Sequence, residues 1–335
     1  MSTVPAVAGA GAEQLWLRLA ENTWVRFGVR RVSRLLVSVW VLVTAAFLMI
    51  HLLPGDPVRA ALGLAVPTEV VNQRRAALGL DDPLWVQYGH YLQHLLTGDL
   101  GVSMTSGLDV SGVIADRLGP TLELAAAAFV LAVLVSVPLG LVMAVLTRGG
   151  RGRRTEMVFT STSVLVVAVP DFLMAVGLVY VFGVQLHLLP VAGRAGPVSY
   201  VLPVLSLMIG PALVLARIVR VEMLAVLQAE FIRTARAKRL PRWTIYLEHA
   251  LPNALTATLT LAGLLLGGLI AGTVLVETVF AWPGLGSTIV ESILAKDYPM
   301  VQGVVLVYGA GVLLINLGVD VALALLDPRS TIKET

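Results

Sequence analysis

The stretch that decides the fold is Glu230-Phe-Ile-Arg-Thr-Ala-Arg-Ala-Lys-Arg-Leu-Pro-Arg-Trp-Thr-Ile-Tyr-Leu-Glu-His-Ala-Leu-Pro-Asn253. It is the most charged segment of a very apolar chain, and apolar runs flank it on both sides. Its residue types favour a helix from Val221 to about Leu240, which Pro241 would end. A second short helix is expected from Trp243 to Leu251, ending at Pro252. The pattern predicts a basic helix-turn-helix at a membrane face, and the alternative is an ordinary loop whose charges only fix topology.

The composition around this stretch is that of a polytopic all-α membrane protein. Hydrophobic residues make up 57% of the 335 residues and charged residues only 13%, with a mean hydropathy of +0.86. A soluble domain carries about twice that share of charge. The chain has no cysteine, which excludes a disulfide framework and thiol chemistry.

Apolar runs long enough to cross a membrane follow one another along the chain. A hydrocarbon core of ~30 Å needs roughly 20 helical residues. Six runs meet this length: Val32–Leu53, Thr121–Leu146, Met157–Val184, Tyr200–Ala216, Ala254–Thr278 and Val301–Leu326. With the N-terminus inside, most of the 24 lysines and arginines fall in inside segments. This bias predicts that both termini are cytoplasmic, and the first run is expected to be an anchor, not a removed signal peptide.

The remaining segments are assigned from this topology. Residues 1–31 are expected to form a cytoplasmic segment, with either an interfacial helix or a mobile tail over Glu13–Arg31. Residues 54–120 are too long for a simple connection, so an ordered external domain is expected there. Residues 121–329 would hold the other five spans together with the connection 217–253, and residues 330–335 would form a cytoplasmic tail.

Two helices are expected in the external segment. One would start at Pro67-Thr68 and end at Gly79, and the other would be capped by Asp82 with Pro83 in its first turn. The second helix carries an apolar stripe that would lie on the membrane surface or support a docking face for an external partner. The stripe consists of Trp85, Tyr88, Leu92 and Leu95.

A family resemblance begins in the basic stretch. The string Arg233-Thr-Ala-Arg-Ala-Lys238 resembles the cytoplasmic loop of the permease subunits of binding-protein-dependent ABC importers, in their peptide and nickel branch. Further strings similar to that branch follow in the family's order over about Val32 to Arg329. They are Leu53-Pro-Gly-Asp-Pro57, Leu78-Gly-Leu-Asp-Asp-Pro-Leu-Trp-Val-Gln-Tyr88, Thr97-Gly-Asp-Leu-Gly101, Arg117-Leu-Gly-Pro-Thr-Leu-Glu-Leu124, Val276-Glu-Thr-Val-Phe280, Pro283-Gly-Leu-Gly286, and Asn316 with Asp320 before Leu326-Asp-Pro-Arg329.

The resemblance implies the six-span type I importer permease fold and a role for the basic stretch. In the family this loop is the coupling helix, which docks into a groove on the ATP-binding subunit. The residues carried over to that role are Glu230, Arg233, Thr234, Ala235, Arg236, Ala237, Lys238, Arg239 and Leu240. Arg239 stands where the family usually has glycine, so either the turn is right-handed or Pro241 makes it.

The resemblance also implies a complex in the bacterial plasma membrane. The expected partners are a second permease subunit, one or two cytoplasmic ATP-binding subunits, an external substrate-binding (lipo)protein and the lipid bilayer, with no nucleic acid. ATP and Mg would bind to the partner subunits, because this chain has no Gly-x-x-x-x-Gly-Lys-Ser/Thr motif. No cofactor is expected on the chain itself.

No catalytic or metal site is predicted. The chain lacks Gly-x-Ser-x-Gly and a cysteine nucleophile. His90 and His94 have the spacing of two metal ligands on one helix face, but Tyr91 stands where the His-Glu-x-x-His pattern needs glutamate. Interface histidines are therefore favoured.

Polar residues inside the expected spans either face a pathway or bond neighbouring helices. They are Asp171, Glu277, Asn316 and Asp320. Asp171 follows Pro170, so it could also bond backbone groups released by a proline kink. Gly263, Gly267, Gly268 and Gly272 give the fifth run a spacing that lets helices approach closely.

The sequence as a whole predicts a permease subunit of an ATP-driven importer for di- or oligopeptides, working by alternating access. The same machinery importing nickel or another small solute is the alternative. An ion-gradient-driven secondary transporter is a further one, although no internal repeat with paired broken helices is visible. An intramembrane enzyme would need a nucleophile or metal constellation that the spans do not show.

Overall fold

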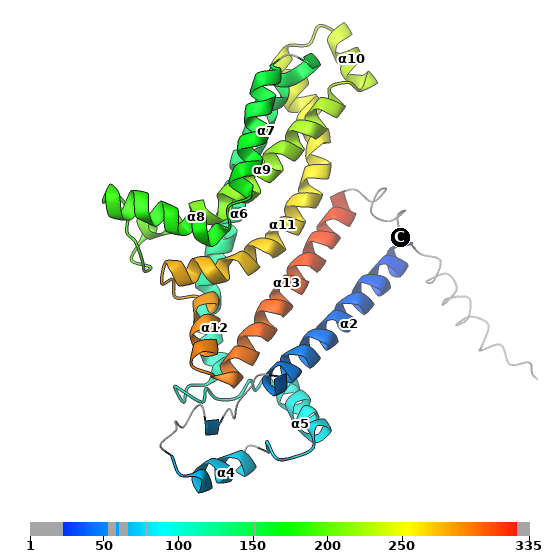
Figure 1. The fold of residues 1–335 in the computed structure, drawn as a ribbon. Helices are drawn as coiled ribbons and strands as arrows, with labels where there is room; N and C mark the ends of the chain where they lie inside the picture. Colours follow the sequence, from blue (N-terminus) through cyan, green and yellow to red (C-terminus); the bar gives the residue numbers. More distant parts are fainter. Residues whose placement is uncertain (1–22, 53–57, 60–65, 78, 151, 327–335) are drawn as a thin grey trace, which may run out of the picture.

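The computed structural model describes residues 23–52, 58–59, 66–77, 79–150 and 152–326. Within these residues the fold is helical, with one isolated β-bridge between Val102 and Asp109. Long apolar helices run side by side along the molecule (Figure 1): α2 (Thr23–Leu52), α6 (Val110–Thr147), α9 (Val201–Val226), α11 (Leu251–Val279) and α13 (Tyr298–Leu326). Each is long and apolar enough to cross a membrane, and a bent helix pair brings the number to as many as six. The predicted all-α, six-span class is therefore confirmed.

The bent pair differs from the straight run expected over Met157–Val184. Helix α7 (Arg153–Val167) and helix α8 (Asp171–Leu178), which continues as a π-helical turn over Val179–Gln185, meet at an angle of 95°. Figure 1 shows α8 leaving the bundle sideways. Pro170 lies at the break with an extended backbone, φ −59° and ψ 144°. Proline cannot donate to the helical ladder, so the sequence ends one helix and starts another here.

Helix α6 reaches beyond the expected second span. Asp109 caps it, because its carboxylate accepts a hydrogen bond from the Gly112 N–H at 2.7 Å. Residues 110–120, expected in the external segment, are thus the first turns of this helix. At 1.5 Å per residue its 38 residues cover about 57 Å, nearly twice the hydrocarbon thickness.

Small residues bring α6 and α9 together in the core. A Cβ on Gly140 would lie 2.5 Å from Cβ of Val219 and 2.6 Å from the carbonyl oxygen of Ala216. Helices α11 and α13 make a similar close contact, because a Cβ on Gly263 would lie 2.1 Å from Cγ1 of Val319. Glycine is required at these positions to let the backbones approach.

Helices α4 (Thr68–Ala77), α5 (Leu84–Leu96) and α12 (Leu285–Leu294) gather at one end of the bundle, opposite α10 (Figure 1). The predicted stripe on α5 packs mainly against α2. Tyr88 meets Phe47 with ring centroids 5.1 Å apart, and its hydroxyl lies 2.8 Å from that of Thr44. Trp85 points away and is 77% exposed.

Helix α2 differs from the expected N-terminal arrangement. The interfacial helix was expected over Glu13–Arg31, and its part up to residue 22 lies outside the described residues. Residues 23–31 are the first turns of α2 itself, continuous with the first span. The tail 330–335 also lies outside the described residues.

Candidate functional site: the connection between α9 and α11

The basic stretch forms a short helix between two breaks. Helix α9 ends at Val226, and Ala229, with ψ 152°, separates it from α10 (Glu230–Ala237). The continuous helix expected from Val221 to Leu240 is therefore wrong. The helix expected from Trp243 to Leu251 does not end at Pro252 either. A π-helical turn over Thr244–Ala250 runs into α11, whose first turn accommodates Pro252.

One face of α10 is anchored in the protein. Ile232 is fully buried and Ala235 is 5% exposed. They pack into an apolar cluster that includes Met223 of α9, Leu227 at its C-cap and Ile245 from the π-helical turn. The spacing of three residues puts both side chains on the same side of the helix. Helix α10 is therefore packed firmly against the ends of α9 and α11.

The other face of α10 is exposed at the end of the molecule (Figure 1). Besides its basic side chains this face carries Phe231, which is 46% exposed, and Trp243, just beyond the turn, is 61% exposed. Among the residues predicted for coupling, Ala235 is buried and Leu240 is half-buried. The exposed ones are Glu230, Arg233, Thr234, Arg236, Ala237, Lys238 and Arg239.

Two arginines on α10 have different roles in its structure. Arg233 pairs with Glu230 one turn earlier at 2.7 Å, and both side chains are largely exposed. Arg236 donates to the carbonyl oxygen of Leu227 at 2.9 Å and so ties α10 back to the end of α9. Partial loss of solvent around its guanidinium lowers the pKa of Arg236, and the neighbouring positive charge of Arg148 lowers it further. Arg233 is therefore the more available of the two for a partner.

The turn after α10 is left-handed at Arg239, contrary to both alternatives considered from the sequence. Its φ is 57°. The Arg239 N–H donates to Arg236 and the Leu240 N–H donates to Ala235, at 2.9 and 3.3 Å. This pair of bonds is the Schellman arrangement, in which the residue after the cap is usually glycine. Arg239 thus adopts the left-handed backbone conformation that glycine usually supplies, although its Cβ makes that conformation less favourable.

The polar residues expected within the spans do not come together with α10 or with one another. Asp320 of α13 forms a salt bridge with Arg31 of α2. Asn316, half-buried on α13, lies against α11, where a Cβ on Gly267 would come within 3.0 Å of its Oδ1. Asp171 lies between α9 and α11, next to Gly210 and Gly272.

Glu277 holds the start of α12. It is fully buried, and its Oε2 accepts hydrogen bonds from the N–H groups of Gly286 and Ser287 at 2.6 and 3.3 Å. A carboxylate is stabilised at a helix N-terminus by the unpaired N–H groups and the helix dipole. The N–H of the preceding residue, Leu285, donates to Thr121 Oγ1 of α6 at 2.9 Å.

The glycines of the Pro283–Gly286 string explain this close approach. A Cβ on Gly284 would lie 2.3 Å from Oε2 of Glu277, and one on Gly286 would lie 2.5 Å from Cα of Val274. The sequence pointed to Glu277 and to the glycine-rich string separately. It held no signal that the string forms the helix start bound by the carboxylate.

Sequence reasoning missed other polar contacts at both ends of the bundle. Arg220 of α9 is only 9% exposed, donates to Thr147 Oγ1 at 2.9 Å, and pairs with Glu156 of α7 at 2.6 Å. The sequence counted it only as a topology signal. Asp297, before α13, accepts from the hydroxyls of Ser103 and Thr105. No local pattern marks a contact between residues so far apart in the chain.

The two histidines of α5 belong to different contacts. His94 Nδ1 lies 3.1 Å from Oδ2 of Asp99. The hydrogen bond from the Gly101 N–H lowers the pKa of Asp99, and the hydrogen bond with His94 lowers it further. His90 lies on the wall of a pocket of about 490 Å³ next to Tyr91 and Gln302. Among the residues that the structure describes, no group of three or more His, Cys, Asp or Glu side chains could hold a metal ion.

Comparison with known proteins gives two family matches. The family "Binding-protein-dependent transport system inner membrane component" matches residues 136–332. The family "Binding-prot-dependent transport system membrane comp, N-term" matches residues 24–125. The matched residues include α10, the whole of α9, α11 and α13, and most of α2 and α6.

Individual proteins match over most of the chain. The glutathione transport system permease protein GsiC of Salmonella choleraesuis (strain SC-B67) is 38% identical over 304 residues, 91% of this chain and 98% of that protein. GsiC of Escherichia coli (strain K12) is 36% identical with the same coverage. A solved structure described as "Crystal structure of an amino acid ABC transporter with histidines" is 16% identical, with a TM-score of 0.46, and covers 65% of this chain and 94% of its own.

Proposed function

The chain belongs to the family of binding-protein-dependent transport system inner membrane components, and on that premise we propose that it is the permease through which an ATP-driven importer moves peptides. In this proposal the chain forms part of the membrane pathway, with a second permease beside it. Separate ATP-binding subunits supply the energy, and an external binding protein delivers the solute. ATP and Mg would be bound by those partners.

The observation that carries the proposal is the construction of α10. Its buried face, Ile232 and Ala235, joins it to the ends of α9 and α11, while its other face presents cations and aromatic rings outward. Exposed aromatic and arginine side chains are the residue types that dominate protein–protein interfaces. A subunit bound there would move two spans directly whenever it changed position.

Alternating access is the mechanism that this connection supports best. ATP binding would draw the partner subunits together and carry α10 with them. Because α10 is packed onto α9 and α11, both spans would tilt and change which end of the pathway is open. In this scheme the α10 end and both termini lie in the cytoplasm, and the end formed by α4, α5 and α12 faces the binding protein.

The peptide class of substrate is supported by the relatives. They are named glutathione transport permeases, and glutathione is a tripeptide. We propose di- and tripeptides or peptide-like solutes of that size as the cargo. Selection among them would rest mainly with the external binding protein.

The coupling role is tested in proteoliposomes that contain the whole importer. The double reversal Arg233→Glu with Arg236→Glu should leave binding of solute to the external protein intact and abolish ATP-driven uptake. Because Arg236 also bonds Leu227, the pair Phe231→Ala with Arg233→Glu tests the exposed face alone and should lower uptake at least tenfold. Arg154→Glu, an exposed arginine at the start of α7, is the matched control and should transport normally.

Three readouts separate the possible outcomes. Loss of uptake with retained ATP hydrolysis would support α10 as the coupling element. Normal uptake by both α10 variants would contradict it. Uptake by the purified chain without ATP, driven by an ion gradient, would overturn the importer proposal as a whole.

A further inference from the structure

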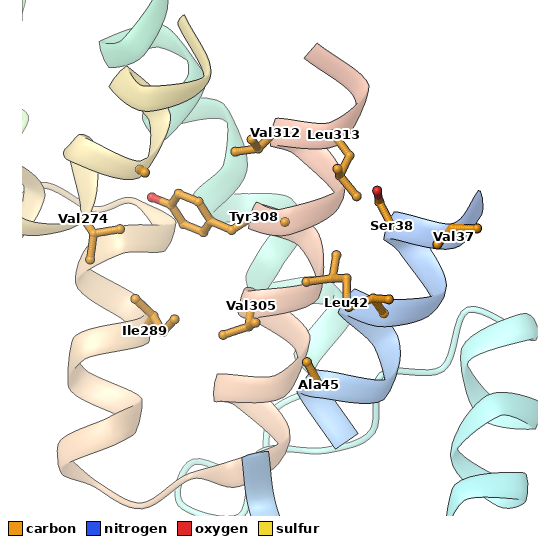
Figure 2. A pocket seen from close by; sticks show the side chains of 13 residues that line it. Val37, Ser38, Leu42, Ala45, Val274, Ile289, Val305, Tyr308, Val312 and Leu313 are labelled. Carbon is orange, nitrogen blue, oxygen red and sulfur yellow. The ribbon is translucent and has the colours of Figure 1, made fainter. Parts of the chain in front are cut away.

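A lateral pocket in the bundle is separate from the coupling segment. It has a volume of about 750 Å³ and lies between α2, α11, α12 and α13. Figure 2 shows Leu42 and Ser38 of α2 on one side of it, and Val305 and Tyr308 of α13 beside them, with Val274 and Ile289 opposite. This volume falls within the ~300–1,000 Å³ range of ligand pockets.

The lining is almost entirely apolar. Apart from Ser38 and Tyr308, every side chain is aliphatic or absent. The Tyr308 hydroxyl is already bonded to Thr273 Oγ1 at 3.0 Å, so it offers little to a polar ligand. A cavity with such walls does not hold water, and its walls belong to helices that are long and apolar enough to cross a membrane. Its natural occupant is hydrocarbon.

One end of the pocket carries a positive charge. Arg34 lies four residues before Ser38 and seven before Val41, so at 3.6 residues per turn it continues the pocket-lining face of α2. It is exposed, and no carboxylate among the described residues pairs with it. Arg31, one turn earlier, is neutralised by Asp320 of α13. The charges that face this end therefore leave an excess of positive charge.

We propose that this pocket is a binding site for an anionic phospholipid, with one acyl chain between α2 and α13 and its phosphate at Arg34. The charge at the end and the hydrocarbon walls match the two parts of such a molecule. Apolar helices of a second permease chain would match the walls, but they would need a carboxylate placed at Arg34 to match the cation as well. The lipid would fill the space between α2 and the rest of the bundle and hold α2 against α13.

The experiment uses the complete importer in nanodiscs that contain a trace of phospholipid with a photoreactive acyl chain. The probe is either phosphatidylglycerol or phosphatidylcholine, and labelled peptides are identified by mass spectrometry. Labelling by phosphatidylglycerol should concentrate on 37–45 and 305–313. The exposed outer face of α7, around Val158 and Leu165, reports general contact with lipid and should label weakly.

Two variants separate the head group from the chain. Arg34→Gln should lower labelling by phosphatidylglycerol about fivefold, the effect of one cation near an anionic lipid, and leave labelling by phosphatidylcholine unchanged. Arg154→Gln, the matched loss of an exposed arginine elsewhere, should change neither. Ala271→Trp fills the pocket and should lower labelling by both probes, with assembly of the importer checked by size-exclusion chromatography.

Other outcomes would overturn the proposal. Equal labelling of the pocket and of α7 would mean that lipid contacts the pocket only as part of the bulk membrane. Absence of pocket labelling in the complete importer, with labelling of the isolated chain, would mean that the second permease covers the pocket. Labelling by phosphatidylglycerol that does not change with Arg34→Gln would show that Arg34 does not bind the head group.

Discussion

Arg239 occupies a backbone conformation that usually belongs to glycine. A left-handed conformation brings the Cβ of an L-residue close to the following carbonyl oxygen, at a cost of roughly 1–2 kcal/mol. The two hydrogen bonds of the turn and the anchoring of Ile232 compensate for this cost. The same handedness recurs at Ala281 and Lys296, where α11 and α12 end. At these three helix ends the left-handed position is thus held by a residue other than glycine, whereas glycine takes a positive φ after α5, at Gly98.

Arg239→Gly should stabilise the protein. Relief of the left-handed strain exceeds the extra entropy that glycine gives the unfolded chain, so the net gain is expected to be up to about 1 kcal/mol. Thermal unfolding in detergent would show it as a higher Tm. Arg242→Gly is the matched control, because Arg242 has a negative φ, and it should lower or not change the Tm. Equal shifts for the two variants would contradict the strain argument.

Glu277 shows how one buried carboxylate can organise a whole connection. Its Oε2 meets the α12 N-terminus, while Thr121 of α6 receives the adjacent N–H. The Trp282 indole N–H donates to the carbonyl oxygen of Pro120 at 3.2 Å. The link between α11 and α12 is thus bonded directly to α6.

At the scale of single helices, close contact between two backbones decides which glycines are required. In α6, Gly140 lies directly against Val219 of α9, whereas Gly119 has open space around its Cα. The same substitution at the two positions therefore separates packing from helix propensity within one helix.

Gly140→Ala should destabilise the protein and Gly119→Ala should not. The added methyl group at residue 140 would force α6 and α9 apart, at a cost of about 1–3 kcal/mol. At residue 119 alanine gains helix propensity of up to about 1 kcal/mol. Thermal unfolding of both variants under one condition measures the difference. A Gly140→Ala protein as stable as the parent would mean that the contact relaxes easily.

The contact between Asp297 and the segment before α6 should weaken in acid. Burial alone would raise the pKa of Asp297, but hydrogen bonds donated by Ser103, Thr105 and the Met104 N–H outweigh it and lower the pKa. A group whose pKa is lowered by folding contributes stability above its unfolded value, near 3.9, and this is lost as the pH falls through the folded value.

Hydrogen exchange of residues 103–109 measures this loss. Exchange protection should be constant at neutral pH and fall below about pH 4. Asp297→Asn should exchange faster at neutral pH and show little further change in acid. A parent protein whose protection does not change down to pH 2 would show that the carboxylate charge contributes nothing to this contact.

At the scale of the whole molecule, much of the fold could be predicted from the sequence because it depends on local properties. Apolar run length located the spans, and the charged interval between α9 and α11 marked the helical residues of α10, although not the break before it. What failed depends on contacts or on backbone geometry. The 95° bend at Pro170 and the left-handed backbone of Arg239 are examples. Residue type predicts neither the angle between α7 and α8 nor the positive φ of an arginine.

Partners distant in the chain were beyond sequence reasoning for the same reason. Asp320 was singled out as a polar residue within a span, but its partner Arg31 lies 289 positions away. Ser103 and Asp297 are 194 positions apart. A single sequence carries no periodicity that links such positions, so the residues were predicted only as candidates and not as pairs.

The Arg31–Asp320 pair should hold the first and last spans together. Each side chain is about a quarter exposed, so its loss is expected to cost about 1–2 kcal/mol, between the values for surface and buried pairs. Asp320→Asn and Arg31→Gln should each lower the Tm, and the double variant should cost less than their sum. Additive losses in this cycle would show that the two side chains do not interact.

The length of α6 has a mechanical consequence. The helix is continuous from the contact with α12 at Thr121 to the contact with Arg220 at Thr147, and α9 lies along it. The pair can act as a lever: with an arm of about 28 Å on each side of its midpoint, a rotation of about 10° displaces either tip by about 5 Å. A modest torque applied at one end of the pair would thus displace the other end without breaking a single helical hydrogen bond.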